Sequence, residues 1–165
     1  MNRIAVYAGT FDPLTLGHVD LILRSAEIFD RVILAVAEAT PKDTLFSAVE
    51  RAAMVGEVTS ELANVEVDIF NELLVNYARA KGAGILIRGL RAYSDFEYEF
   101  QMALTNRKLA PEIETLFMMP KEIHSYVSSS TVREVAGLGG DTSEFVPASV
   151  QKHLTAYFKR GIKSD

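Results

Sequence analysis

Ile4-Ala-Val-Tyr-Ala-Gly-Thr-Phe-Asp-Pro-Leu-Thr-Leu-Gly-His18 is the stretch of sequence that decides the fold. Its first five residues form a short apolar run that predicts a buried strand, and Gly9 closes that run. Apolar residues at helical spacing follow, at Val19, Ile22, Leu23 and Ala26. A strand, a loop and a helix in this order are the first part of a βαβ unit.

The same unit repeats along the chain. Further apolar runs predict strands at 32–37, 65–70, 85–87 and 115–119. Helical spacing predicts helices between these strands over 47–62, 73–81 and 94–109, the first and last opened by the capping boxes Ser47-x-x-Glu50 and Ser94-x-x-Glu97. Two terminal helices begin near 129–131 and near Pro147, the second ending before Gly161. Strands alternating with helices predict a Rossmann-like, doubly wound five-stranded parallel sheet with helices on both faces and C-terminal helices.

Length and composition restrict the class of protein. The chain has 165 residues, 48% hydrophobic and 24% charged, with no linker or internal sequence repeat, so we expect one domain over 1–165. A net charge of −5 disfavours broad binding to nucleic acid or to anionic membranes. The absence of cysteine excludes disulfides and thiolate chemistry. With no signal-peptide core and no run near the ~18 apolar residues of a membrane span, we expect a cytoplasmic protein.

The loop after the first strand carries the clearest chemistry. Ligands of open α/β sheets bind beyond the carboxyl ends of the strands, where the strand order reverses. In this loop Gly9 permits close approach, Thr10 adds a hydroxyl, and His18 enters the first turn of a helix. A histidine at a helix N-terminus can donate to a phosphoryl oxygen as charge develops on it. The alternative is that the glycines serve turns and His18 caps or packs.

Cationic side chains follow two other strands. Lys42 lies in a Pro-bounded loop after the second strand, where it either approaches a phosphate or remains a solvated surface lysine. Arg88-Gly89-Leu90-Arg91 follows the fourth strand and offers two guanidinium forks suited to phosphate. Pairing of these arginines with Asp95, Glu97 or Glu99 is the structural alternative.

Hydroxyls and backbone N–H groups follow the fifth strand. The segment His124-Ser125-Tyr126-Val127-Ser128-Ser129-Ser130-Thr131 precedes a helix and can bind another anion, although serines in this position are often caps. Glu99 and Asn106 fall on the preceding helix, where a solvated face is expected unless the fold turns them toward the site.

Competing motifs are missing from the sequence. It contains no Walker loop, no Gly-x-Gly-x-x-Gly after a strand, no His-Glu-x-x-His and no nucleophile elbow. A rim with cations and backbone donors but without a conspicuous nucleophile favours direct phosphoryl-type transfer by positioning and charge stabilisation.

Several segments together resemble one family. They are Tyr7-Ala-Gly-Thr-Phe-Asp-Pro13 with Gly17-His18, Lys42, Ile87-Arg-Gly-Leu-Arg91, Asp95-Phe-Glu-Tyr-Glu99 and Ser128-Ser-Ser130. The chain is similar, essentially end to end, to the bacterial phosphopantetheine adenylyltransferases of the nucleotidylyltransferase superfamily. It departs from the usual pattern at Ala8, where proline is common, and at Leu74 and His124, where methionine and tryptophan are common.

The resemblance implies transfer of the adenylyl group of ATP to 4′-phosphopantetheine, giving 3′-dephospho-CoA and pyrophosphate with Mg²⁺ accompanying ATP. It implies catalytic roles for His18, Thr10, Lys42 and Arg91, and substrate binding by Thr10, Lys42, Leu74, Arg88 and Asn106. It implies ATP contacts from Thr10, Phe11, His18, Gly89, Leu90, Arg91, Glu99, His124, Ser125, Tyr126, Val127, Ser128, Ser129 and Ser130, with no dedicated metal ligands. A homohexamer and feedback inhibition by coenzyme A are further implications.

Two other functions compete with this one. The first is a nucleotidylyltransferase that uses CTP or another acceptor such as nicotinate mononucleotide. The second is a regulatory module that keeps the fold and binds nucleotide without turnover, an alternative that the presence of His18, Lys42 and both arginines disfavours.

Overall fold

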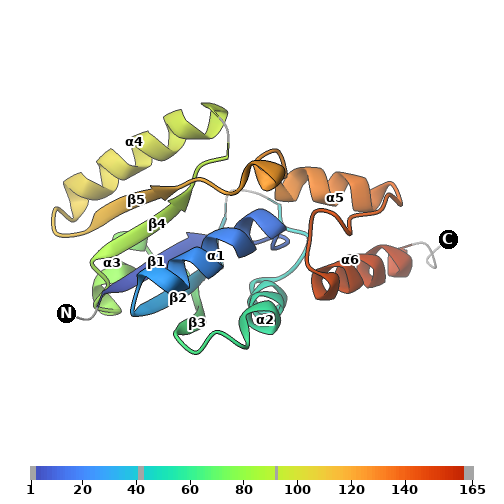
Figure 1. Ribbon diagram of the computed structural model, residues 1–165, viewed down its shortest axis with the longest axis horizontal. Coiled ribbons are helices and arrows are strands. Elements are labelled where there is room, and N and C mark those ends of the chain that lie inside the picture. The colour runs from blue at the N-terminus through green and yellow to red at the C-terminus, as the bar shows by residue number, and fades with distance from the viewer. Residues whose placement is uncertain (1–2, 41–42, 92, 162–165) are drawn as a thin grey trace.

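Five parallel strands form one sheet in the computed structural model, which describes residues 3–40, 43–91 and 93–161 (Figure 1). The strands are β1 (Ile4–Gly9), β2 (Arg31–Ala37), β3 (Val65–Phe70), β4 (Ile85–Gly89) and β5 (Glu114–Met118). Their order is β3-β2-β1-β4-β5, so the order reverses between β1 and β4. The predicted five-stranded parallel α/β sheet is confirmed.

Helices follow the strands at the predicted places. They are α1 (Leu16–Ile28), α2 (Ala48–Thr59), α3 (Leu74–Ala80), α4 (Tyr93–Leu109), the 3-10 turn η1 (Glu122–His124), α5 (Ser129–Gly137) and α6 (Ala148–Gly161). Some predicted boundaries were wrong. The second helix ends at Thr59 rather than Leu62, and α4 begins at Tyr93, which places Ser94 inside its first turn and not at its N-cap. Strand β4 extends through Gly89, so Arg88 and Gly89 belong to the strand and not to the loop after it.

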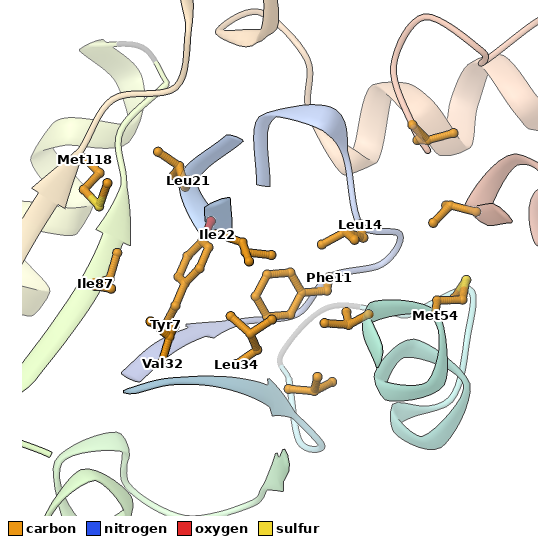
Figure 2. Packing of buried hydrophobic residues seen from close by; sticks show 14 of the residues in the cluster. Tyr7, Phe11, Leu14, Leu21, Ile22, Val32, Leu34, Met54, Ile87 and Met118 are labelled. Atoms are coloured by element: carbon orange, nitrogen blue, oxygen red, sulfur yellow. The ribbon is translucent and has the colours of Figure 1, made fainter. Parts of the chain in front are cut away.

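The sheet separates two hydrophobic clusters, because successive side chains of a strand point to opposite faces. Ala5 and Tyr7 of β1 join the larger cluster with α1, α2, α5 and α6, whereas Val6 and Ala8 join a smaller cluster with α3. Figure 2 shows the rings of Tyr7 and Phe11 in the larger cluster, with centroids 5.5 Å apart. Both faces of the sheet are therefore covered, and its central strands are buried as the apolar runs predicted.

Helix α4 lies beside the β4–β5 edge of the molecule (Figure 1). Among its described side chains only Glu99 and Asn106 are buried, whereas six large hydrophobic side chains are exposed: Phe96, Tyr98, Phe100, Met102, Leu104 and Leu109. The expectation that Glu99 and Asn106 face solvent was therefore wrong. Within the described residues, no helix combines the length and apolar character needed to cross a membrane.

Candidate active site

A pocket of about 440 Å³ lies at the point where the strand order reverses, between the carboxyl ends of β1 and β4. Parallel strands bring the loops that follow them to this edge, so residues distant in sequence meet there. The residues lining the pocket are Tyr7, Ala8, Gly9, Thr10, Phe11, Asp12, Thr15, Gly17, His18, Leu21, Asp43, Thr44, Arg88, Gly89, Arg91, Asp95, Tyr98, Glu99, Pro120, Ser128, Ser129, Ser130 and Arg133.

His18 is held in one orientation by the capping box of α1. The backbone N–H of Thr15 donates to Nδ1 of His18 over 3.0 Å, and the His18 backbone N–H donates to Oγ1 of Thr15 over 3.3 Å. Because Nδ1 accepts this bond, the neutral ring carries its proton on Nε2. In the described part of the chain Nε2 has no protein partner, and no unpartnered side-chain nitrogen is buried, so Nε2–H is open to the pocket. His18 therefore caps its helix and also presents a donor to the site.

The charge state of His18 follows from its surroundings. Burial, and secondly the positive charge of Arg91, lower the pKa of His18 from 6.5 to about 4. Both causes disfavour the imidazolium ion. The ring is therefore neutral near pH 7 and acts as a hydrogen-bond donor, not as a cation.

The loop after β1 takes its shape from packing. Phe11 has a positive φ of 51°, and its buried ring packs edge-on against His18 with centroids 5.2 Å apart. A Cβ on Gly9 would lie 2.9 Å from Cζ of Phe11. The Phe11 ring therefore occupies the space that a side chain at position 9 would need, while Gly9 also lines the pocket, so close approach of a phosphate to its backbone stays a prediction. Phe11 leaves its backbone, not its side chain, for ligand contacts.

Arg88 pairs with Glu99, as the structural alternative predicted. Its Nε and Nη2 donate to the two oxygens of Glu99 over 2.7 Å each, and Nη1 donates to the carbonyl of Ala8 over 2.9 Å. Glu99 is buried and Arg88 is partly buried at the pocket wall. Arg88 is therefore fixed between β1 and α4, and its remaining N–H groups are the ones available to a ligand.

Arg91 is held more loosely. Its Nε lies 3.1 Å from Oδ2 of Asp95, and Nη1 donates to the carbonyl of Val127 over 3.4 Å. Both side chains of the Arg91–Asp95 pair are partly exposed. These two bonds leave three of the five N–H groups of Arg91 for an anion.

Each of the three serines at the N-terminus of α5 has a partner of its own. Ser128 caps α5 by accepting from the Thr131 N–H, and Oγ of Ser129 donates to the carbonyl of Pro13 over 2.8 Å. Oγ of Ser130 accepts from Nη2 of Arg133 over 3.4 Å. The interpretation of these serines as structural is confirmed for Ser128, and all three also line the pocket beside the N-terminus of α5.

Several predicted site residues are not among the described residues that line the pocket. Lys42 lies outside the described residues. Leu74 begins α3 and packs against the smaller cluster, Asn106 is buried on α4, and Leu90 donates its N–H to the carbonyl of Met118. The segment from His124 to Val127 lies close by, since a Cβ on Gly17 would be 3.4 Å from the carbonyl of His124, but its side chains are also absent from the lining: His124, Ser125, Tyr126 and Val127.

Sequence reasoning missed several residues of the site. Asp12 accepts the N–H groups of Leu45 and Phe46 over 2.7 and 3.0 Å, and Arg133 of α5 binds the Asp12 carbonyl and carboxylate. Tyr7 is buried, yet its hydroxyl has no protein partner among the described residues and opens to the pocket. Asp12 and Tyr7 stand inside the motif that opened the sequence, which was the available signal. Arg133 had none, because one arginine on a terminal helix is common.

Comparison with known proteins places the chain in a family. Residues 6–135 match the cytidylyltransferase-like family. Phosphopantetheine adenylyltransferase of Methylococcus capsulatus is 56% identical over 96% of this chain and 98% of its own. The enzymes of that name from Alkaliphilus metalliredigens and Desulforudis audaxviator are 53% and 54% identical, over 93% and 94% of this chain and 98% and 96% of theirs.

Two solved structures share the fold at low sequence identity. A putative nicotinate-nucleotide adenylyltransferase from Vibrio parahaemolyticus has a TM-score of 0.72 at 20% identity, covering 97% of this chain and 96% of its own. A bifunctional NMN adenylyltransferase/ADP ribose pyrophosphatase from Francisella tularensis has a TM-score of 0.72 at 14% identity, covering 96% and 50%. These structures are similar in fold alone, whereas the relatives at 53–56% identity share most of the sequence. The chain therefore belongs to the phosphopantetheine adenylyltransferases, within the cytidylyltransferase-like nucleotidylyltransferases.

Proposed function

We propose that the protein transfers the adenylyl group of ATP to 4′-phosphopantetheine, giving 3′-dephospho-CoA and pyrophosphate, by direct in-line attack of the acceptor phosphate on the α-phosphorus. The observation that carries this proposal is the orientation of His18, whose Nε2–H opens to a pocket that also holds Thr10, Arg91 and the N-terminus of α5. Such a pocket binds phosphates and supplies donors to a transition state without a covalent intermediate.

His18 acts on the α-phosphate in this mechanism. As the acceptor oxygen bonds to phosphorus and the bond to pyrophosphate breaks, negative charge gathers on the remaining oxygens of the α-phosphate. A fixed donor aimed at that charge stabilises the transition state more than the ground state. The lowered pKa of His18, about 4, keeps the ring neutral and its Nε2–H in place. Thr10 assists from the neighbouring loop.

The proposed ATP side of the pocket is formed by residues after β4 and by residues at the N-terminus of α5. Free N–H groups at the start of a helix favour anions, so the residues from Ser128 to Ser130 suit the phosphates of ATP. Arg91, loosely held by Asp95, adds a mobile positive charge. The remaining proposed nucleotide contacts are Phe11, Gly89, Leu90, Glu99, His124, Ser125, Tyr126 and Val127; of these, the last four and Leu90 would act from just outside the pocket wall.

The acceptor side involves Lys42, Arg88 and Thr10. The two N–H groups of Arg88 that are not committed to Glu99 or Ala8 suit the acceptor phosphate. Leu74 and Asn106 lie away from the pocket lining, so their proposed part is to contact the pantetheine arm where it leaves the pocket.

Mg²⁺ is proposed to arrive with ATP. Among residues 3–40, 43–91 and 93–161, no group of three or more His, Asp or Glu is placed to hold a metal ion. The pocket carboxylates of Asp12 and Glu99 are engaged by backbone N–H groups and by Arg88. These residues fit an ion carried mainly by substrate phosphates and water, which is how Mg²⁺ usually binds. When bound, it neutralises phosphate charge.

Three further proposals concern partners and location. Coenzyme A contains the product of the reaction, so it fits the same pocket as a feedback inhibitor. The exposed apolar side chains of α4 suit contact with another copy of the chain, and we propose a homohexamer that buries them. A cytoplasmic location agrees with a chain that lacks cysteine.

The test is an assay of pyrophosphate release by the purified protein. ATP with 4′-phosphopantetheine is expected to react, whereas CTP, or ATP with nicotinate mononucleotide, is not. His18→Ala is expected to lower kcat at least 100-fold with little change in ATP affinity, since it removes an interaction made mainly in the transition state, of the kind worth about 10²–10³ in rate. The matched control is His153→Ala, an exposed histidine of α6. Activity only with another substrate pair, or full turnover by His18→Ala, contradicts the proposal.

A further inference from the structure

Arg51 of α2 is among the most deeply buried side chains in the described structure, with a relative exposure of 1%. Its Nε donates to the carbonyl of Phe46 over 3.0 Å, and its Nη1 donates to the carbonyls of Thr10 and Ala37 over 2.7 and 2.8 Å. All three partners are backbone carbonyl oxygens, so the hydrogen bonds of the guanidinium hold backbone segments together.

These carbonyls belong to two segments that border the pocket. Thr10 lies in the loop after β1, which leads into α1 and its residue His18. Ala37 is the last residue of β2, and Phe46 follows Asp43 and Thr44, which line the pocket from the second side. A single side chain therefore joins the loop after β1 to both ends of the segment after β2.

A second link runs parallel to the first. The carboxylate of Asp12 accepts the N–H groups of Leu45 and Phe46 over 2.7 and 3.0 Å. Arg51 thus binds the carbonyl of Phe46 while Asp12 binds its N–H. Together the two links fix the distance between the loop after β1 and the segment after β2.

If Arg51 served only the stability of the fold, burying its charge would cost more free energy than burying an apolar side chain. Desolvating a guanidinium costs several kcal/mol, and a well-packed apolar side chain in its place is often neutral or stabilising. Burial lowers the pKa of Arg51, against the opposing effect of Asp12. Arg51 does not itself line the pocket, so any effect on the reaction must pass through the loops that it holds.

We propose that Arg51 is a positioning residue for adenylyl transfer: it sets the distance between the loop that carries Thr10 and the pocket segment that carries Asp43 and Thr44. This inference rests on the proposed function. In-line transfer requires the two reacting groups at near-attack distance, and a misplacement of about 1 Å costs about 100-fold in rate. An error in loop separation affects the reaction of two bound substrates more than the binding of either one.

The test compares Arg51→Met and Arg51→Lys with Val55→Ala, a control that leaves a cavity on the same buried face of α2 and keeps the Arg51 side chain. All are assayed well below their melting temperatures. We expect kcat to fall about 100-fold in Arg51→Met and less in Arg51→Lys, which keeps one donor group. The affinities for ATP and for 4′-phosphopantetheine, each measured alone, are expected to change far less than kcat. Val55→Ala is expected to lose stability and keep kcat.

A second measurement does not depend on catalysis. Amide hydrogen exchange of Leu45 and Phe46 is expected to accelerate at least tenfold in the Arg51 variants and not in Val55→Ala, since local opening sets exchange. If Arg51→Met does not fold, Arg51→Lys carries both measurements. Unchanged kcat and exchange, or equal losses in Val55→Ala, overturn the proposal. A wild-type protein inactive with ATP and 4′-phosphopantetheine overturns the proposed function instead, and hydrogen exchange still decides whether Arg51 fixes the loops.

Discussion

The backbone N–H of Thr15 donates to Nδ1 of His18 over 3.0 Å, so the ring that faces the pocket also completes the first turn of α1. Oγ1 of Thr15 accepts the His18 N–H and also lies 3.0 Å from the same Nδ1.

Thr15→Ala is expected to cost about 1 kcal/mol of stability, because it removes the side-chain cap of α1. The backbone donor to Nδ1 survives this change, so the loss of kcat is expected to be much smaller than in His18→Ala. Urea unfolding and the pyrophosphate assay measure the two effects, with Thr15→Ser as the variant that keeps the cap. A loss of kcat as large as that of His18→Ala would show that the threonine side chain, not the backbone, orients the ring.

The pH profile of kcat is expected to lack an acid limb near 6.5. The pKa of His18 is lowered to about 4 by burial and by Arg91, so the donor form persists as pH falls below the ordinary value for histidine. Steady-state rates between pH 5 and 8, with saturating substrates, check this expectation. A decline centred near 6.5 that disappears in an active His18 variant such as His18→Gln would contradict it.

Stability is expected to depend on the same group. The unfolded state binds a proton near pH 6.5 and the folded state only near pH 4, so His18 destabilises the fold as pH falls through this window, by at most about 3 kcal/mol. Above pH 6.5 both states are neutral and this loss is absent. Urea unfolding between pH 4 and 7 is expected to show a steeper loss in the wild type than in His18→Gln. Parallel curves would refute the assigned shift.

Glu99→Ala is expected to destabilise the protein by about 3 kcal/mol, the lower end for breaking a buried ion pair, because Arg88 remains partly exposed. The double variant Arg88→Met/Glu99→Leu removes both charges and is expected to recover much of the stability without recovering turnover. Thermal unfolding and the pyrophosphate assay separate the two roles. Recovery of turnover in the double variant would show that the pair serves the fold alone.

Phe96→Ser/Phe100→Ser is expected to dissociate the proposed hexamer. The two rings stack 5.5 Å apart on α4 and are about half exposed, and apolar patches of this kind mark interfaces. Light scattering coupled to gel filtration measures the mass of the assembly against the 18.2 kDa chain. Leu138→Ser removes an exposed apolar side chain elsewhere and is the control. A monomeric wild type rules the proposal out.

Most of the sheet could be predicted because its central strands are buried on both faces. Runs such as Val32 to Ala37 have no polar alternation and fit no other element of that length. Boundaries were less certain where a polar side chain belongs to a strand. Arg88 was predicted to lie in a loop because it is charged. Strand β4 accommodates it because Glu99, eleven residues away on α4, pairs with its charge.

The site was predictable where residue type alone limits the chemistry. Glycine, threonine and histidine after a strand suggested a phosphate loop. The sequence offered capping and catalysis as alternative roles for His18. The capping box makes the two roles compatible, because one ring nitrogen caps the helix and the other faces the pocket. Arg51 was missed because arginine in an amphipathic helix is normally solvated. Only the fold shows that three backbone carbonyls surround it.

One wall of the pocket between β1 and β4 is formed by residues that come late in the sequence. The sheet is complete at Met118, whereas Ser128 to Ser130 and Arg133 come afterwards and close the pocket over the loop that contains Asp12. A chain that ended before Ser128 would therefore keep the residues of all five strands but lose this wall of the pocket.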